Sequence, residues 1–301
     1  MMSKLLPLSQ AIAKYVSDGD IVYAAGFTHL IPFAAGHEMI RQGRRDLTLA
    51  RATPDLIYDQ MVAAGCARRV IFSYMGNPGV GSLRIVRAAI EQGRLEWEEY
   101  SHFGMITRLQ AGASGLPFLP MNQTGAADLE KVNPNIKRIP DPYGGKDIIV
   151  VPALHPDVAI VHVQRADADG NAHLWGIIGE QKEAAFAAKK VIVTAEEIVD
   201  AAVIRSDPNR TMIPAIVVSA VCHVPFACHP SYAQGYYDRD NEFYLAWDKI
   251  SDSADSVKQY LDEWVHDLED RNEYWEKLGK ATHKRLQVKP RYSERINYGS
   301  Y

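Results

Sequence analysis

The sequence has few cysteines, no long hydrophobic run and almost no excess of charge. Its three cysteines, Cys66, Cys222 and Cys228, are an odd number in a chain of 301 residues, which favours a reducing compartment over a disulfide framework. No run approaches the length of about 18 apolar residues that a membrane span needs, and the start has no small-residue cleavage site. We therefore expect a cytoplasmic protein that does not bind a membrane.

The charge is also too balanced for a constitutive nucleic-acid binder. Lys and Arg number 33 and Asp and Glu number 37, for a net charge of −4, whereas such binders usually carry a basic surplus. Hydrophobic residues make up 47% of the chain, which is typical of a protein with a packed core. We expect no nucleic-acid partner.

The first half of the chain alternates between helical and strand-like patterns. The expected strands cover 21–25, 47–51 and 70–75, and the expected helices cover 8–16, 33–42, 56–64 and 82–92. Because the strand segments are apolar throughout, both faces of their sheet should be covered. This predicts an α/β fold with a mainly parallel open sheet and helices on both faces.

The alternation of helical and strand-like patterns stops after residue 120. Residues 121–147 contain three prolines and three glycines and read as a long connecting loop. Strand-like runs follow at 148–154, 158–164, 172–175 and 191–194, then an extended pair or long strand at 213–224 and a helix at about 254–278. We expect one domain over 1–301, with a parallel lobe over 1–120 and a mixed sheet segment plus a long C-terminal helix over 148–301.

Two strand ends carry small residues that would let a ligand approach the backbone. Gly26, Phe27, Thr28 and His29 follow the first expected strand, and glycine imposes little steric limit there. The segment Gly76, Asn77, Pro78, Gly79 and Val80 follows the third expected strand, where a parallel sheet presents free N–H groups. A tight turn explains the second loop equally well, and a packing role explains His29 better than catalysis.

Other catalytic motifs are incomplete. Cys222-His223 and Cys228-His229 lack the spacing of a zinc site, so we expect no metal. The segment 112–115 is not a full nucleophile elbow and reads as helix. Adjacent carboxylates such as Glu98 and Glu99 do not face one point. The residues alone therefore predict loops at strand ends and no obvious nucleophile.

Taken together, several segments resemble the α subunits of family I CoA-transferases, in particular those of glutaconate CoA-transferases. The resemblance covers nearly the whole chain and rests on AIAKYVSDGDIVYAAGFT, EMIRQGRRDLT, GLPFLP, HPDVAIVHVQRADADGNAHLWG, VIVTAEEIVD and ACHPSYAQGYYDRDNEFY in this order. The family signature at the first loop has Gly-Gly-Phe, whereas this chain has Ala25-Gly26-Phe27.

The resemblance implies the CoA-transferase family I fold and an enzyme that moves CoA from an acyl-CoA to a free carboxylic acid. It implies a glutamyl-CoA thioester on a partner β subunit, an α2β2 or larger assembly, CoA thioester as substrate and no permanently bound cofactor. Catalytic residues in this chain are then absent, with His102 as a possible exception. The resemblance places substrate at the two loops above and at Ser101, His102, Phe103, Gln123, Gly125 and Ala126.

Departures from the family pattern leave alternatives open. Ser101-His102-Phe103 stands where related hydrolases carry a Glu, yet histidine can act as a general base. The alternatives are therefore an acyl-CoA hydrolase or decarboxylase of the same family, and a non-catalytic binding protein of this fold. Leu30 and Ile31 stand where basic residues are expected, and a buried carboxylate needs a cation. We therefore expect an acyl group whose far end is uncharged, unless Arg84 or Arg87 supplies the charge.

Overall fold

We describe residues 3–76, 81–121 and 128–288 of the protein from a computed structural model. Nine strands form one sheet, in the order β11-β9-β8-β1-β2-β3-β4, and β10 pairs with both β8 and β12. They are β1 (Ile21–Ala24), β2 (Leu47–Ala50), β3 (Ala67–Phe72), β4 (Glu96–Glu99), β8 (Val158–Ala166), β9 (Ala172–His173), β10 (Lys190–Ile198), β11 (Thr211–Ile213) and β12 (Ala220–His223). All pairings are parallel except those of β9.

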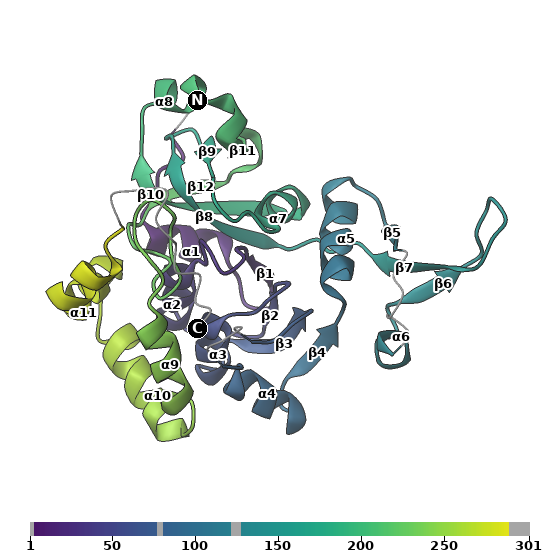
Figure 1. Ribbon diagram of the computed structural model, residues 1–301, viewed down its shortest axis with the longest axis horizontal. Coiled ribbons are helices and arrows are strands. Elements are labelled where there is room, and N and C mark those ends of the chain that lie inside the picture. Colours follow the sequence, from purple (N-terminus) through teal and green to yellow (C-terminus); the bar gives the residue numbers. More distant parts are fainter. Residues whose placement is uncertain (1–2, 77–80, 122–127, 289–301) are drawn as a thin grey trace.

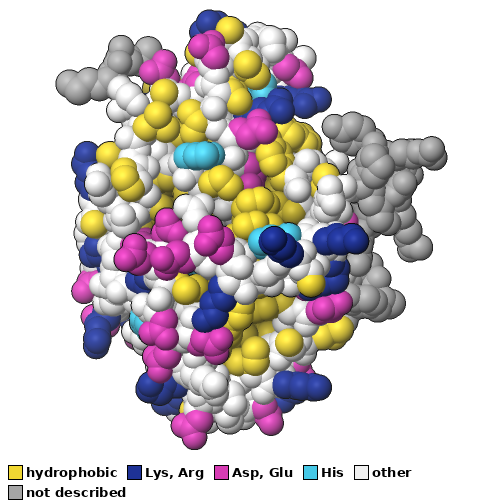
Figure 2. Space-filling view, turned by 90° about the vertical axis from the view of Figure 1, so that its left-hand side faces the viewer, with side chains coloured by type: hydrophobic (Ala, Val, Ile, Leu, Met, Phe, Trp, Pro, Cys, Tyr) yellow, Lys and Arg dark blue, Asp and Glu magenta, His cyan; other side chains and the backbone are white. Residues whose placement is uncertain are grey.

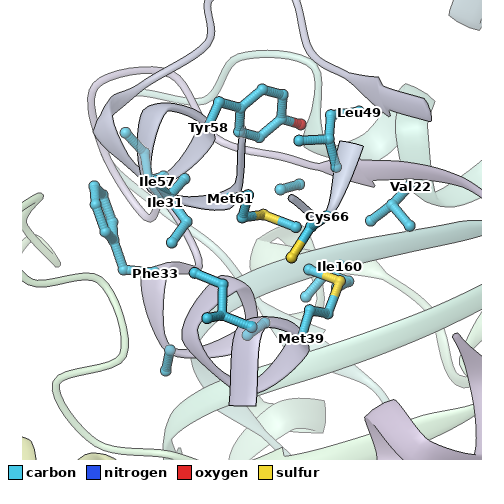
Figure 3. Packing of buried hydrophobic residues seen from close by; sticks show 14 of the residues in the cluster. Val22, Ile31, Phe33, Met39, Leu49, Ile57, Tyr58, Met61, Cys66 and Ile160 are labelled. Carbon is cyan, nitrogen blue, oxygen red and sulfur yellow. The ribbon is translucent and has the colours of Figure 1, made fainter. Parts of the chain in front are cut away.

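Helices cover both faces of this sheet (Figure 1). The helices are α1 (Leu8–Tyr15), α2 (Phe33–Arg41), α3 (Leu56–Ala63), α4 (Arg84–Glu91), α5 (His102–Ala113), α6 (Leu129–Val132), α7 (Gln181–Ala187), α8 (Ala201–Ser206), α9 (Asn241–Ile250), α10 (Ala254–Leu261) and α11 (Arg271–Leu286). Successive strand residues point to opposite faces, so Val22 belongs to a core shared with α1–α4 and α9–α10, and Tyr23 to one shared with α5 and α7. Figure 3 shows part of the first core, where Val22, Leu49 and Ile160 meet Met39 and Met61.

The expected fold class is confirmed by this mainly parallel, doubly covered sheet. The helices and strands expected in the first 92 residues are all present, although β4 was not expected. Strands from before and after residues 121–147 share the large sheet, because β8 pairs with β1. The extended segment at 213–224 is two strands that pair with different neighbours, β11 with β9 and β12 with β10.

The segment expected as a loop over 121–147 also holds regular structure. A second, three-stranded sheet has the order β5-β7-β6, with β5 (Phe118–Met121), β6 (Lys137–Ile139) and β7 (Ile148–Pro152). Figure 1 shows it projecting from the body beyond α5. The loop prediction was wrong for α6 and for β6. Strand β6 gains its hydrogen bonds from antiparallel pairing with β7, which the local sequence does not reveal.

The expected helix at 254–278 was wrong as a single element. After α10 the chain forms a π-helical turn over Asp262–His266, and α11 starts anew at Arg271. The Asp270 side chain caps this new start by accepting hydrogen bonds from the N–H groups of Asn272 and Glu273, a strong helix-start signal. Figure 2 looks at the side where α10 and α11 lie and shows hydrophobic patches between charged side chains. No helix within the described ranges is long and apolar enough to span a membrane.

Candidate active site

The loop after β1 turns sharply at the carboxyl edge of the sheet, where ligands usually bind in parallel sheets. Gly26 has a φ of 137°, and a Cβ at this position would lie 2.8 Å from the carbonyl oxygens of both His29 and Leu30. Only glycine fits this turn. The turn leaves Phe27 and Thr28 half-buried at the surface, whereas Leu30 and Ile31 are fully buried in the core.

His29 holds this loop against two neighbouring segments. Its side chain is fully buried, and its Nδ1 lies 3.0 Å from the carbonyl oxygen of Ile177. Its Nε2 accepts a hydrogen bond from the Gln234 N–H at 3.0 Å. Burial lowers the pKa of His29 to about 4, so the ring is neutral at physiological pH. We interpret His29 as the residue that fixes the loop, because both ring nitrogens are already engaged.

The loops after β1 and β4 meet at this edge. Ser101 caps α5 by accepting a hydrogen bond from the Gly104 N–H, which leaves His102 exposed on the first turn. The Phe27 and His102 rings lie edge to face, with centroids 5.6 Å apart. Phe103, beside them in sequence, is 52% exposed. The structure thus brings together two of the segments that the sequence analysis selected.

The tautomer of His102 follows from its partner. The Ser73 hydroxyl donates its only proton to the carbonyl oxygen of Ala52, at 2.5 Å, and lies 3.1 Å from Nδ1 of His102. Nδ1 therefore donates to Ser73, and the lone pair of a neutral imidazole is on Nε2. No hydrogen bond joins Nε2 to any described residue. His102 can consequently offer a base to a molecule bound at this edge.

Some of the selected residues cannot be placed. Asn77, Pro78, Gly79, Val80, Gln123, Gly125 and Ala126 lie outside the described residues. Gly76, at the start of the second loop, is buried. Contact between substrate and the selected residues stays a prediction, both for the residues outside the described ranges and for those that the structure places.

Arg51 and Glu180 were missed by the sequence analysis and lie next to the first loop. Arg51 directly follows β2, is fully buried and donates from Nη2 to the carbonyl oxygen of Gly26 at 2.5 Å. Glu180 precedes α7 and is 1% exposed. Burial raises the pKa of the Glu180 carboxyl, and the nearby Arg51 charge partly opposes that rise. The position of Arg51 at the end of an expected strand could have indicated a site residue. Glu180 offered no such signal, because the helix that it precedes, α7, was not expected.

One group of side chains could hold a metal ion. The ligand atoms of His162, Glu196 and Cys228 all lie within 4.8 Å of one another. Each nitrogen of His162 already has a partner, Thr194 Oγ1 and Glu196 Oε1, both at 2.8 Å. Burial also raises the pKa of the Cys228 thiol, which keeps its proton. We interpret the group as a buried hydrogen-bond network that joins β8 and β10 to the segment after β12.

The structure also places the two arginines that could have supplied a charge to the acyl pocket. Arg84 forms an ion pair with Asp248 of α9 at 2.7 Å, and both Arg84 and Arg87 line a groove of about 800 Å³ between α4 and α10. They do not supply a cation to the first loop. Tyr232 and Tyr237 are buried in the core of this chain, at 1% and 2% exposure, and so are not available to a partner surface.

Comparison with known proteins identifies the family. The sequence model described as Coenzyme A transferase matches residues 6–223. The chain belongs to the coenzyme A transferase family. This confirms the resemblance on which the sequence analysis relied.

Alignments with individual CoA-transferases extend over almost the whole chain. The 3-oxoadipate CoA-transferase of Pseudomonas knackmussii has one subunit that is 50% identical over 93% of this chain and 100% of its own length. The corresponding subunit of glutaconate CoA-transferase from Acidaminococcus fermentans is 38% identical over 96% of each chain, and the crystal structure of that enzyme matches with a TM-score of 0.88. A decarboxylase, AibA/AibB, matches at 29% identity over 86% of this chain and 99% of its own, with a TM-score of 0.73.

Proposed function

We propose that this chain is the α subunit of a CoA-transferase that moves CoA from an acyl-CoA to a free carboxylic acid, with the nucleophile on a β subunit. The observation that carries the proposal is the composition of the loops at the carboxyl edge. The described segments 26–29, 73–76, 101–104 and 176–179 contain no Asp, Glu, Cys or Lys. The carboxyl of Glu180 is buried, so it cannot attack a bound thioester.

A carboxylate from the partner completes the chemistry. It attacks the acyl-CoA carbonyl, forms a mixed anhydride and releases the CoA thiolate. The thiolate then attacks the enzyme's own carbonyl, which leaves a glutamyl-CoA thioester and frees the carboxylic acid. A second acid reverses both steps and leaves with CoA. The loops of this chain would form one wall of the site, where N–H groups stabilise the negative oxygen of each tetrahedral intermediate.

Exposed apolar side chains at the same edge support a partner there. Tyr74, Phe103 and Ile178 are 54%, 52% and 40% exposed, respectively, and belong to the loop after β3, the start of α5 and the loop before α7. Large apolar side chains at a site rim favour burial by another protein. A β subunit seated here would cover them and bring its Glu to the loops, in a cytoplasmic α2β2 or larger assembly.

The names of the relatives support a dicarboxylic substrate. The two CoA-transferases described above are named for 3-oxoadipate and glutaconate, which are both dicarboxylates. The expectation of an uncharged far end assumed that the first loop has no cation, but Arg51 lies directly behind that loop. We therefore favour a short dicarboxylic acid as the acyl group.

The exposed His102 keeps a hydrolase-type or decarboxylase-type reaction as the second candidate. Relatives with such names include a cholesterol ring-cleaving hydrolase subunit from Mycobacterium tuberculosis, 26% identical over 89% of this chain. If transfer through a partner Glu is correct, His102→Ala should lower kcat less than about 100-fold, below the full effect of a general base. A loss of about four orders of magnitude in a folded variant would favour the second candidate.

The direct test uses the chain with and without its partner. The purified chain alone should transfer no CoA from an acyl-CoA to several carboxylic acids, and addition of a β-type chain should restore transfer. Clear turnover by the single chain would overturn the proposal. If the complex releases free CoA in the absence of an acceptor acid, the reaction is hydrolysis and not transfer.

A further inference from the structure

Three buried side chains behind the first loop have polar atoms with no hydrogen-bond partner in the described part of the chain. Among the described residues, no group lies in hydrogen-bond geometry with Nε and Nη1 of Arg51, both carboxyl oxygens of Glu180, or Nε2 of Gln181. The Tyr23 side chain is nevertheless close enough to Glu180 to lower the pKa of its carboxyl. Arg51 and Gln181 are 0% exposed and Glu180 is 1% exposed. An unpaired buried polar group destabilises a protein, and a charged one destabilises it more. Such a group in a native protein calls for an explanation, and function is a common one.

Their position ties them to the candidate site. Arg51 donates from Nη2 to the carbonyl oxygen of Gly26, so its positive charge lies directly behind the loop that carries Phe27 and Thr28. Gly179, next to Glu180, packs against Phe27 so closely that a Cβ there would lie 2.6 Å from the Phe27 Cβ. A fixed charge in a poorly hydrated interior acts over several ångströms, and Arg51 therefore influences a ligand on the outer side of this loop.

Glu180 opposes that charge. The two side chains interact electrostatically, yet no direct ion pair joins them. If Glu180 is ionised, it cancels the field of Arg51 at the loop. If it carries a proton, one positive charge remains, and the loop can attract an anion.

We propose that Arg51 is the cation that selects a carboxylate-bearing acyl group or acceptor, and that Glu180 takes up a proton from solvent when this carboxylate binds. This inference rests on the proposed function and assigns its specificity. Arg51 acts here as a specificity residue, and Glu180 as the residue that regulates its charge.

The surroundings of Glu180 fit this coupling. The charged and titratable groups that act on it come from several elements: Arg51 after β2, Tyr23 on β1, Tyr58 on α3 and His102 on α5. Burial is the largest cause of the raised Glu180 pKa. A second carboxylate nearby would raise that pKa further, so dicarboxylate binding should weaken as pH increases, whereas binding of a monocarboxylate should change less.

The experiment compares two acids of equal length, adipate and hexanoate, as CoA acceptors of the complete α/β enzyme. The measured quantity is the ratio of their kcat/KM values between pH 6 and pH 9. Arg51→Gln should reduce the preference for adipate at least tenfold, through KM, and Arg51→Lys should restore part of it. Glu180→Gln, which imitates the protonated acid, should increase the preference at high pH and flatten its pH dependence. Arg84→Gln is the matched control, because Arg84 pairs with Asp248 on α9, and it should leave the ratio unchanged.

The two variants are expected to change the preference for adipate in opposite directions, which a purely structural role of Arg51 and Glu180 would not produce. The inference is overturned if Arg51→Gln lowers both values in the same proportion, or if Glu180→Gln reduces the preference for adipate. If Arg51→Gln does not fold, the Glu180→Gln result decides. Transfer by the wild-type enzyme without preference for adipate contradicts the inference alone. Absence of transfer to any carboxylic acid contradicts the proposed function instead.

Discussion

Two regions of this molecule bury charged side chains, and they treat them in opposite ways. Behind the first loop, Arg51 and Glu180 have polar atoms that form no hydrogen bond with any residue the structure describes. Under α11, the buried carboxylate of Asp240 is matched by Arg285, whose side chain is 34% exposed. Asp240 accepts two hydrogen bonds from Arg285, at 2.8 and 3.0 Å, and lies 3.0 Å from Nε2 of His229.

The second region, which we call the α11 clamp, comprises His229, Asp240, Arg271, Tyr274 and Arg285. Nδ1 of His229 lies 2.9 Å from the Tyr274 hydroxyl, and Arg271 donates to the carbonyl oxygens of Phe226 and His229. The clamp fixes the segment that contacts the first loop, since the Ser231 hydroxyl donates to the carbonyl oxygen of Thr28. The hydrogen-bonded clamp thus positions the loop, whereas the ligand response that we propose depends on Arg51 and Glu180 behind it.

The largest effect should come from breaking the clamp. Asp240→Ala leaves the buried His229 ring and the Phe243 N–H without their acceptor, which costs about 1–3 kcal/mol for each group. The Arg285 side chain is 34% exposed and keeps Glu242 as a partner, so loss of its ion pair with Asp240 adds less. Urea denaturation of the variant should show that loss in the free energy of unfolding. Asp207→Ala removes an exposed pair with Arg210 and should cost less than about 1 kcal/mol. Equal losses in the two variants would remove the distinction between clamp and surface.

The next effect is the pH dependence of the clamp. Burial lowers the pKa of His229 from 6.5 to about 4, so the unfolded chain binds a proton in that interval and the folded chain does not. The contribution of His229 is therefore complete above pH 6.5 and is lost as pH falls toward 4, by about 3 kcal/mol. The free energy of unfolding of His229→Gln should depend less on pH between 4 and 6.5. An unchanged slope would show that His229 titrates normally in the fold.

A smaller pH effect on the free energy of unfolding, opposite in sign to that of His229, is expected from Glu180 behind the first loop. The folded state raises the pKa of Glu180, so its ionisation destabilises the fold as pH rises through that pKa. Glu180→Gln removes this charge and should increase the free energy of unfolding at pH 8 by roughly 1 kcal/mol relative to wild type. The gain should vanish at acidic pH. A lower free energy of unfolding for Glu180→Gln at pH 8 would show that Glu180 stabilises the fold, as the clamp residues do.

The sequence predicted the framework better than the site. Apolar strands and amphipathic helices determined the parallel sheet, because burial on both faces leaves a local pattern in segments such as 21–25 and 47–51. The loop around Gly26 was predictable for a similar reason, since glycine marks the turn. Leu30 and Ile31 were misread as pocket positions, although they fill the core. The pairing of Arg51 with Glu180 depends on two residues that are far apart in the sequence, and no local pattern encodes such a distant contact.

The central claim is that this chain is one half of a CoA-transferase whose covalent intermediate forms on the other half. The most direct test incubates the complex with acyl-CoA alone, quenches it in acid and weighs each chain by intact mass spectrometry. We predict a CoA thioester adduct on the β-type chain and an unmodified mass for this chain, 33.6 kDa. A CoA adduct on this chain, with none on its partner, would contradict the account.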